Sequence, residues 1–499
     1  MPITRTRPAH LAALAALFGL SAPAVGCARV LELGCAAGGN IIPLAAQHPP
    51  ARFTGLDLSA RHIEDGRSRI AACGLDNISL RQADLAGYVP DGRAFDYVIC
   101  HGVFSWVPRP IQDAILRICR DALAPNGLAT ISYNVLPGWH LRAVVRDICL
   151  YYAGTDGPPQ HRVAKARAAL EQLAREAPGD QPYGMSLRAE ASRLRTMPAA
   201  YILGEFLAPD NAPCTVQDFI ARAGQSGLDY LCEADLSAST PQAIGPTLQE
   251  DPALIGTGRA AVEQRIDFLT GRTFRCSVMV RTPTVERQPM PSAERLRPLH
   301  VASPLRFDAG GSTDEAAVFS SGRGPPITTS DPVVRRALMR LAAAYPATLG
   351  LDELAAGDAT DAGAVRARIG GALLPLVMSG QASVSVLPLQ VGRASDDWPK
   401  VWAFARMEAA SGQPWITSLG HVGVPAYPVL RALLPYLDGL HDRAALRGLF
   451  IDAVASGALE ATELPADQAS RPAERPDAVA EHHVEQTLRF CARHALLEP

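Results

Sequence analysis

Lysine is almost absent from this chain of 499 residues. Only Lys165 and Lys400 occur, so arginine supplies nearly all of the 47 basic residues. GC-rich codon usage accounts for this bias as well as any function does, and we draw no functional conclusion from it. The formal net charge is only -3 at pH 7, which excludes a general attraction to nucleic acid or to an anionic membrane.

Paired cysteines and long apolar runs are also missing. The ten cysteines are scattered, without a C-x-x-C pair, so we exclude a disulfide framework and a zinc site and expect a reducing compartment. No apolar run approaches the roughly 20 residues that span a bilayer. The hydrophobic content of 48% and charged content of 19% indicate a folded protein instead. Its length is enough for about two to four domains.

The N-terminus resembles a secretion signal at first sight. Arg5 and Arg7 precede an apolar stretch over residues 11–20, and residues 24–27 read Ala-Val-Gly-Cys, like a lipoprotein cleavage site. Cleavage before Cys27 would expose the start of the first predicted core strand. The apolar side chains share one face of a helix instead, so we predict a packed helix and a cytoplasmic protein. These side chains are Leu11, Leu14, Leu17 and Phe18.

Strand and helix patterns alternate from Arg29 to Arg142, with short turns between them. This alternation is typical of a parallel sheet with right-handed crossovers. The predicted fold class is therefore α/β, a Rossmann-like sheet in a first domain spanning residues 1–154. Its five expected strands are Val30–Leu33, Phe53–Leu58, Ile78–Arg81, Tyr97–Cys100 and Leu128–Tyr133.

The composition changes after Tyr152. Residues 155–212 are charged and helical and are broken by prolines, so we predict a helical insertion. Two later strands, Tyr230–Glu233 and Phe274–Val280, could complete the sheet. The predicted regions are an insertion or regulatory region over 155–284, a linker over 285–330 that is rich in Pro, Ser, Gly and Arg, and two winged-helix-like α+β modules over 331–390 and 391–499.

The stretch Val30-Leu-Glu-Leu-Gly-Cys-Ala-Ala-Gly-Gly-Asn40 carries the clearest chemical signal. Gly34 lets the chain turn sharply off the first strand, and Ala36 and Gly38 let the backbone pass close to a ligand. A dinucleotide enzyme would need G-x-G-x-x-G to hold a pyrophosphate. Glu32, two residues before the first glycine, suits a cationic ligand instead. Alone the signal is weak, because many glycine-rich turns only connect a strand to a helix.

Two aspartates follow the next two strands. Asp57 ends the second strand, 23 residues after Gly34, where a carboxylate can bind both ribose hydroxyls. Its alternative role is a helix N-cap, for which Ser59 is the better candidate. Asp84 follows the third strand and is placed to bind an adenine amino group. The order and spacing of these residues indicate a nucleoside-binding site more specifically than any one of the residues does.

Two further motifs lie at the next two strands. The motif Phe95-Asp-Tyr-Val-Ile99 overlaps the fourth strand, and the turn into the fifth strand is Leu123-Ala-Pro-Asn-Gly-Leu128. With the glycine-rich turn and the two aspartates, they make the chain similar to the class I S-adenosylmethionine (SAM)-dependent methyltransferases. The resemblance implies SAM as the cofactor and no metal. The cofactor contacts that we expect are Glu32, Gly34, Ala36, Gly38, Asp57, Leu58, Asp84, Leu85 and Cys100.

Motifs over most of the chain point to a narrower family. They are Ser105–Pro108, Ser132–Trp139, Tyr201-x-x-x-Glu205-x-Leu207, Asp267–Leu269 and Arg272–Arg275. Here the chain resembles bacterial methyltransferases with a methyltransferase regulatory domain, a family that includes the rickettsial protein-lysine methyltransferases of outer-membrane protein B. Two departures bear on substrate handling. An expected N-terminal segment with a Tyr and a Pro-Phe pair does not precede the first helix, and Gly204 replaces a His beside Glu205.

Methyl transfer from a sulfonium is an in-line displacement, so the enzyme mainly aligns the nucleophile, the methyl group and the leaving sulfur. A lysine acceptor has a reference pKa of about 10.4 and must lose a proton first. We predict that Tyr133 and Asn134, at the end of the fifth strand, face the methyl position, with His101 and Trp106 beyond the fourth strand. Alternatively, Tyr133 and Trp106 are core aromatics and His101 is a turn histidine.

Three functions stay open from the sequence. We expect a protein-lysine N-methyltransferase first, a small-molecule, lipid or glycan methyltransferase second, and a non-catalytic SAM-binding scaffold third. The partner is then a protein, such as a surface or outer-membrane protein, or a small molecule. Nucleic acid is not expected, because residues 326–499 hold 15 basic and 19 acidic residues and DNA binding depends on neutralising phosphates.

Overall fold

The computed structural model describes residues 1–499 except 91, 93, 240–257, 283–289, 358–360 and 460–475. Its N-terminal half is organised by a seven-stranded sheet in the order β3-β2-β1-β4-β5-β7-β6. Strands β1 to β5 are parallel, and β7 is antiparallel to both of its neighbours. This confirms the Rossmann-like sheet and its completion by the two late strands. The strands are β1 Arg29–Leu33, β2 Arg52–Asp57, β3 Ile78–Gln82, β4 Phe95–Cys100, β5 Leu123–Asn134, β6 Leu228–Glu233 and β7 Phe274–Arg281.

Helices cover both faces of the sheet, as the continuous apolar runs of its central strands require. Leu31 and Leu33 pack into a core with helices α4 (Arg109–Ala122) and α9 (Val216–Gln225) on one face. Val30, which points to the other face, packs into a second core. That core contains α1 Pro8–Leu17, α2 Ile41–Gln47 and α3 Ala60–Ala72.

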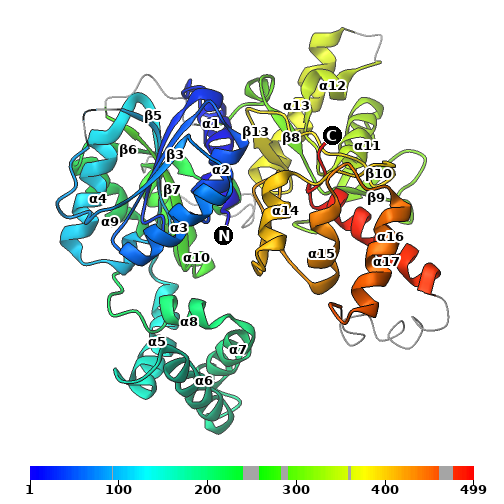
Figure 1. The fold of residues 1–499 in the computed structure, drawn as a ribbon. Helices are drawn as coiled ribbons and strands as arrows, with labels where there is room; N and C mark the ends of the chain where they lie inside the picture. The colour runs from blue at the N-terminus through cyan, green and yellow to red at the C-terminus, as the bar shows by residue number, and fades with distance from the viewer. Residues whose placement is uncertain (91, 93, 240–257, 283–289, 358–360, 460–475) are drawn as a thin grey trace.

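Helix α1 lies between the sheet and the C-terminal region (Figure 1). Leu11, Leu14 and Leu17 are fully buried, which confirms a packed helix, and the alanines between them are buried as well. The ring of His10 lies 2.7 Å from the carbonyl oxygen of Ala234, which follows β6. Its other nitrogen is 3.3 Å from the carbonyl oxygen of Val384 in the C-terminal region. The helix therefore joins the two halves of the molecule.

Four helices after β5 form a separate lobe at the lower left of Figure 1. They are α5 Trp139–Ala153, α6 Pro159–Glu176, α7 Pro182–Thr196 and α8 Ala199–Glu205. The lobe has its own apolar core, which includes Cys149, Leu170 and Phe206. The insertion between the fifth and sixth strands is thus helical, as predicted. Trp139 ties it to the following segment by donating a hydrogen bond from Nε1 to Oδ1 of Asn211 at 2.6 Å.

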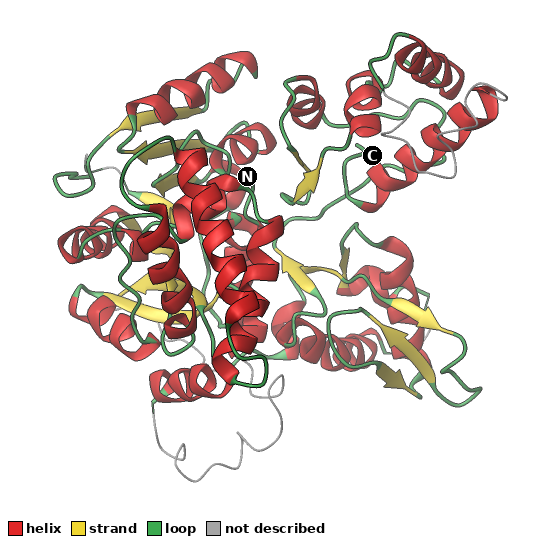
Figure 2. Cartoon of the chain, turned by 90° about the horizontal axis from the view of Figure 1, so that it is seen from below, coloured by secondary structure: helices red, strands yellow, loops and turns green. Residues whose placement is uncertain are grey.

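The C-terminal region contains two units beside the sheet, which Figure 2 shows from below. The first has helices α11 Pro332–Ala344, α12 Leu351–Ala355 and α13 Ala362–Met378. The second has α14 Ala403–Ala410, α15 Pro428–Leu433, α16 Arg443–Ala455 and α17 Pro476–Arg493, with the strand pair β14 Trp415–Thr417 and β15 Gly423–Pro425. Their apolar residues belong to the same continuous core as α1 and Val30, so this region packs directly on the sheet domain.

The expectation of a linker over residues 285–330 does not hold for its described part. This part contains four short strands, and β8 (His300–Ala302) is the central strand of the sheet β12-β8-β13 in the first C-terminal unit. Leu296, Val301 and Phe319 are buried. Strands of three or four residues leave too short a pattern to separate from the surrounding Pro, Ser and Gly. The remaining strands are β9 Arg306–Asp308, β10 Ala317–Ser320, β11 Ile327–Thr329, β12 Leu349–Gly350 and β13 Ser383–Ser385.

Candidate active site

The glycine-rich stretch forms a tight turn after β1. Gly34 and Gly38 have φ angles of +72° and +74°, which glycine adopts without strain. A Cβ on Gly34 would lie 2.3 Å from Cγ2 of Val103. Ala36 also has a positive φ, +47°, and this conformation is strained for a residue with a side chain. Strain of this kind gathers where the backbone must approach a ligand.

Asp57, the last residue of β2, is fixed beside this turn. Its Oδ2 accepts a hydrogen bond from the backbone N–H of Ala36 at 2.8 Å, and its Oδ1 accepts one from that of Ser59 at 2.9 Å. The N-cap of α3 is Ser59, whose side chain accepts from the backbone N–H of His62. Asp57 is therefore not the helix cap. It holds the turn, and its side chain is 15% exposed beside it.

The neighbouring side chains form a mixed apolar and acidic rim. Leu58 is 67% exposed, an unusual state for a leucine directly after a core strand. Asp84, after β3, is exposed and accepts a hydrogen bond from the backbone N–H of Ala86 at 2.9 Å, while Leu85 beside it is buried. Cys100, at the end of β4, is fully buried, so it can offer a ligand only its backbone. Carboxylates beside an exposed apolar surface suit a nucleoside.

Glu32 lies beneath the turn and is only 4% exposed. Its Oε1 accepts a hydrogen bond from Nδ2 of Asn40 at 2.8 Å. Its Oε2 is buried and has no hydrogen-bond partner in the part of the chain that the structure describes. Burial raises the pKa of this carboxyl to about 7, partly offset by the Asn40 hydrogen bond. An unpaired buried carboxylate oxygen is an acceptor that a cationic ligand can satisfy, so these residues fit SAM.

The four predicted catalytic residues differ in their surroundings. Tyr133 is 1% exposed, stacks on Phe219 with ring centroids 4.0 Å apart, and shares a hydrogen bond with Ser277 through its hydroxyl. Trp106 packs edge-to-face against Trp139. Tyr133 therefore has the surroundings of a core aromatic, whereas Trp106 is half-buried. Asn134 is also buried, and its Nδ2 has no hydrogen-bond partner among the described residues.

His101 alone among these four lines an open cleft of about 680 Å³. The cleft lies between the carboxyl edge of the sheet and the C-terminal region. Phe274, at the start of β7, contacts the His101 ring at a centroid distance of 5.7 Å. The guanidinium of Arg5 lies 5.8 Å from the centre of the Phe274 ring. Arg323 and Asp235 also line the cleft, and no residue of the helical lobe does. The cleft residues other than His101 were not predicted from the sequence as site residues, because they come from distant segments.

Residues 1–5 connect this cleft to the glycine-rich turn. Met1 and Ile3 line the cleft, and the backbone N–H of Ile3 donates to Oδ1 of Asn40 at 2.9 Å. A Cβ on Gly39 would lie 2.3 Å from the Met1 nitrogen. Residues 1–5 therefore lie between the glycine-rich turn and the cleft, and the described residues that line the cleft include His101 but none of the predicted cofactor residues. Among the described residues, no group of three His, Cys, Asp or Glu side chains could hold a metal ion.

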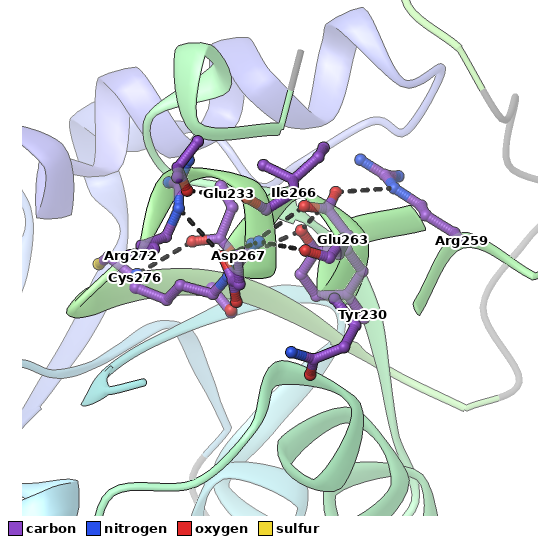
Figure 3. A network of polar contacts seen from close by, with 12 residues as sticks. Tyr230, Glu233, Arg259, Glu263, Ile266, Asp267, Arg272 and Cys276 are labelled. Carbon is purple, nitrogen blue, oxygen red and sulfur yellow. Dashed lines mark hydrogen bonds and ion pairs between the residues drawn. The ribbon is translucent and has the colours of Figure 1, made fainter. Parts of the chain in front are cut away.

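The Arg272–Arg275 motif and Asp267 belong to a buried ion-pair network instead (Figure 3). Arg275 is fully buried and lies within 3.1 Å of carboxylate oxygens of Glu233, Glu263 and Asp267. Arg272 pairs with Asp267 and Arg259 with Glu263, which brings the network to three cations and three anions. The network joins β6, β7 and α10 (Arg259–Thr270). The network fixes β7 to β6 at the antiparallel edge of the sheet. Phe274, the first residue of β7, lines the cleft.

Comparison with known families agrees with this geometry. A model described as a methyltransferase domain matches residues 30–127, one described as a predicted methyltransferase regulatory domain matches 198–281, and one described as the C-terminal winged helix domain of PKMT matches 397–496. The uncharacterized protein RP028 of Rickettsia prowazekii is 32% identical over 44% of this chain and 88% of its own length. This chain belongs to the class I SAM-dependent methyltransferases.

Similarity extends over the whole methyltransferase. The uncharacterized protein RP789 of Rickettsia prowazekii is 28% identical over 92% of this chain and 85% of its own length. The solved structure of PKMT2 from Rickettsia typhi has a TM-score of 0.85, covers 100% of this chain and 99% of its own, and is 24% identical. A second structure of PKMT2, in complex with AdoHcy, has a TM-score of 0.84. At this identity the match shows a shared fold, including the C-terminal winged helix.

Proposed function

We propose that this methyltransferase transfers methyl groups from SAM to lysine side chains of a protein, which enters the cleft beside His101. The observation that carries the proposal is the cleft itself. It is open, and it is bordered by the C-terminal region as well as by the sheet. Such a shape accepts a segment of polypeptide. The full-length fold match to a protein named PKMT2 supports the same acceptor class.

The predicted catalytic role of His101 has physical support from its surroundings. Burial, and secondarily the charge of Arg5, lowers the pKa of His101 to about 4, so the imidazole is neutral at physiological pH. A neutral imidazole does not repel an incoming lysine, and it can accept a hydrogen bond from the amine. The amine lone pair is then oriented, which is the main requirement of an in-line displacement. SAM supplies the electrophilic methyl group on its sulfonium.

The charges of the cleft favour the neutral form of the acceptor. Arg5 and Arg323 line the cleft, and nearby cations lower the pKa of an amine. Asp235, the acidic side chain of the cleft, is held by Ser237, whose Oγ donates to its Oδ1 at 2.6 Å. Phe274 offers an apolar surface for the methylene chain of a lysine. These groups suit a long aliphatic side chain that ends in an amine.

The test uses the full-length chain, labelled SAM and two acceptor pools from a cell lysate, proteins and small molecules. We expect label in the protein pool, recovered as methyl-lysine after acid hydrolysis, and none after reductive dimethylation of the protein lysines. Label confined to small molecules, or recovered on another residue type, would overturn the proposal. His101→Phe should lower kcat roughly 10–100-fold, whereas His161→Gln, a change on the exposed surface of the lobe, should not.

A further inference from the structure

A histidine of the C-terminal winged helix reaches the cofactor turn. His421 lies between β14 and β15, within the segment that matches the winged-helix model. It is fully buried, and its Nε2 lies 2.9 Å from Oδ1 of Asn40. Asn40 in turn donates from Nδ2 to Oε1 of Glu32 at 2.8 Å. Two hydrogen bonds therefore connect the winged helix to the acidic residue beneath the glycine-rich turn.

The partners of Asn40 fix the direction of both hydrogen bonds. The carboxylate of Glu32 accepts, so the Asn40 atom facing it is the amide nitrogen. The opposite atom is the amide oxygen, which also accepts from the backbone N–H of Ile3. His421 must then donate from Nε2. Its Nδ1 is buried and has no hydrogen-bond partner among the described residues, which fits a neutral ring with its single proton on Nε2.

The backbone at His421 is held in a costly conformation to make this contact. Its φ angle is +57°, in the left-handed region that non-glycine residues rarely occupy. The carbonyl of Ser418 accepts from the backbone N–H of His421 at 2.8 Å, and Thr4 Oγ1 donates to the His421 carbonyl at 3.0 Å. Strained residues persist where the surrounding structure over-determines them, and they often serve a function.

We propose that His421 is a positioning residue for the cofactor. It holds Asn40, Asn40 holds one oxygen of Glu32, and the other oxygen is kept in place as the acceptor for a cationic group of SAM. The winged helix thus completes the cofactor site, although His421 and Asn40 are 381 positions apart in the sequence. The pair Arg69–Glu408, at 3.4 Å, shows that the same module also contacts α3.

The matched control is a second hydrogen bond to the same turn. Gln47, at the end of α2, donates from Nε2 to the carbonyls of Ser418 and Leu419 at 3.4 and 3.2 Å. This contact anchors the turn to the cofactor domain but does not touch Asn40. Gln47→Ala therefore removes an interdomain hydrogen bond without removing the one that we invoke. It separates a positioning effect from a general loosening of the interface.

The experiment measures SAM affinity of full-length variants by calorimetry. His421→Met fills the space without a donor and should weaken SAM binding about fivefold, the value of one neutral hydrogen bond. His421→Gln keeps an N–H at nearly the same reach and should restore affinity to within twofold. Gln47→Ala should bind SAM as the parent does.

Three results would overturn the proposal. The first two are parental SAM affinity in folded His421→Met and an equal loss in Gln47→Ala. A loss in His421→Gln as large as that in His421→Met would do so too, because the donor would then be irrelevant. If His421→Met does not fold, as judged by circular dichroism, His421→Gln and Gln47→Ala can still contradict the proposal. A loss of SAM affinity in either His421→Gln or Gln47→Ala would then contradict the proposal.

Discussion

Two buried polar clusters in the sheet domain differ in one respect. In the cluster around Arg275, all six carboxylate oxygens of its three acids have partners. In the cluster around Glu32, one carboxylate oxygen has none among the described residues. Buried charges are expensive unless they are paired. In the first cluster every carboxylate oxygen is paired, while in the second, one carboxylate oxygen remains for a further donor.

The difference separates a structural network from a binding site. Both clusters contain residues of motifs that stand out in the sequence, and spacing alone does not distinguish them. The Arg275 network has equal numbers of cations and anions and secures β7 to β6 and α10. The Glu32 cluster lies below a strained turn that carries Asp57 at its edge.

The largest effect should follow from breaking the closed cluster. Arg275→Met leaves three carboxylates without their central cation, and removing one partner of a buried ion pair costs about 3–5 kcal/mol. The free energy of unfolding, measured with urea, should fall by that amount. Arg120→Met removes an exposed pair with Asp121 and should change it by less than about 1 kcal/mol. Similar losses in the two variants would contradict the structural role of the network.

Removing Asp57 should affect cofactor binding more than stability. Asp57→Ala deletes the carboxylate beside the turn, and hydrogen bonds to a charged group are worth about 1.5–3 kcal/mol. We expect SAM affinity to fall roughly 10–100-fold in a folded protein, measured by calorimetry. Asp76→Ala, at an exposed site before β3, is the control. Unchanged SAM affinity in folded Asp57→Ala would refute the ribose contact.

The open cluster should respond to pH. Burial raises the pKa of Glu32 to about 7, above its unfolded value, so the ligand-free folded protein binds the extra proton. Protonation of Glu32 therefore contributes to the free energy of unfolding. This contribution is fully present below the pKa of Glu32 in the unfolded chain and is lost as the pH rises through 7. SAM prefers the ionised carboxylate, so its affinity should rise about tenfold between pH 6 and pH 8 as Glu32 ionises.

The comparison with Glu32→Gln isolates this effect from the titration of SAM itself. The variant should show a flatter dependence of SAM affinity on pH, measured by calorimetry in the same buffers. If the parent and the variant show the same slope, Glu32 is not the titrating group.

The smallest effect concerns the strained turn over the open cluster. Ala36 has φ +47°, and glycine at this position removes the strain but gains freedom in the unfolded chain. Ala36→Gly should therefore stabilise the protein by at most about 1 kcal/mol in thermal unfolding. Ala37→Gly, at a residue without a positive φ, should destabilise it by roughly 0.5–1 kcal/mol. Destabilisation by Ala36→Gly to the same extent would show that the turn is not strained.

The elements closest to the cofactor turn were predictable because they are local. The strand before Gly34, the N-cap at Ser59 and the helical insertion all follow from short-range patterns, and the structure contains each of them. The short strands over residues 290–330 were not predictable, because three residues give no period. Tyr133 is buried against Phe219, which belongs to a helix more than 80 residues later. The residues around Tyr133 do not predict this contact.

The sequence by itself determined the class of enzyme, since a glycine-rich turn with acids after successive parallel strands depends only on neighbouring residues and on the order of the strands. Only the tertiary structure decided which polar residues are left unsatisfied. Arg275 is neutralised by acids from β6 and α10, and Glu32 is reached through Asn40 by His421 from the far end of the chain. Burial and pairing depend on contacts across hundreds of residues, and those contacts exist only once the chain is packed.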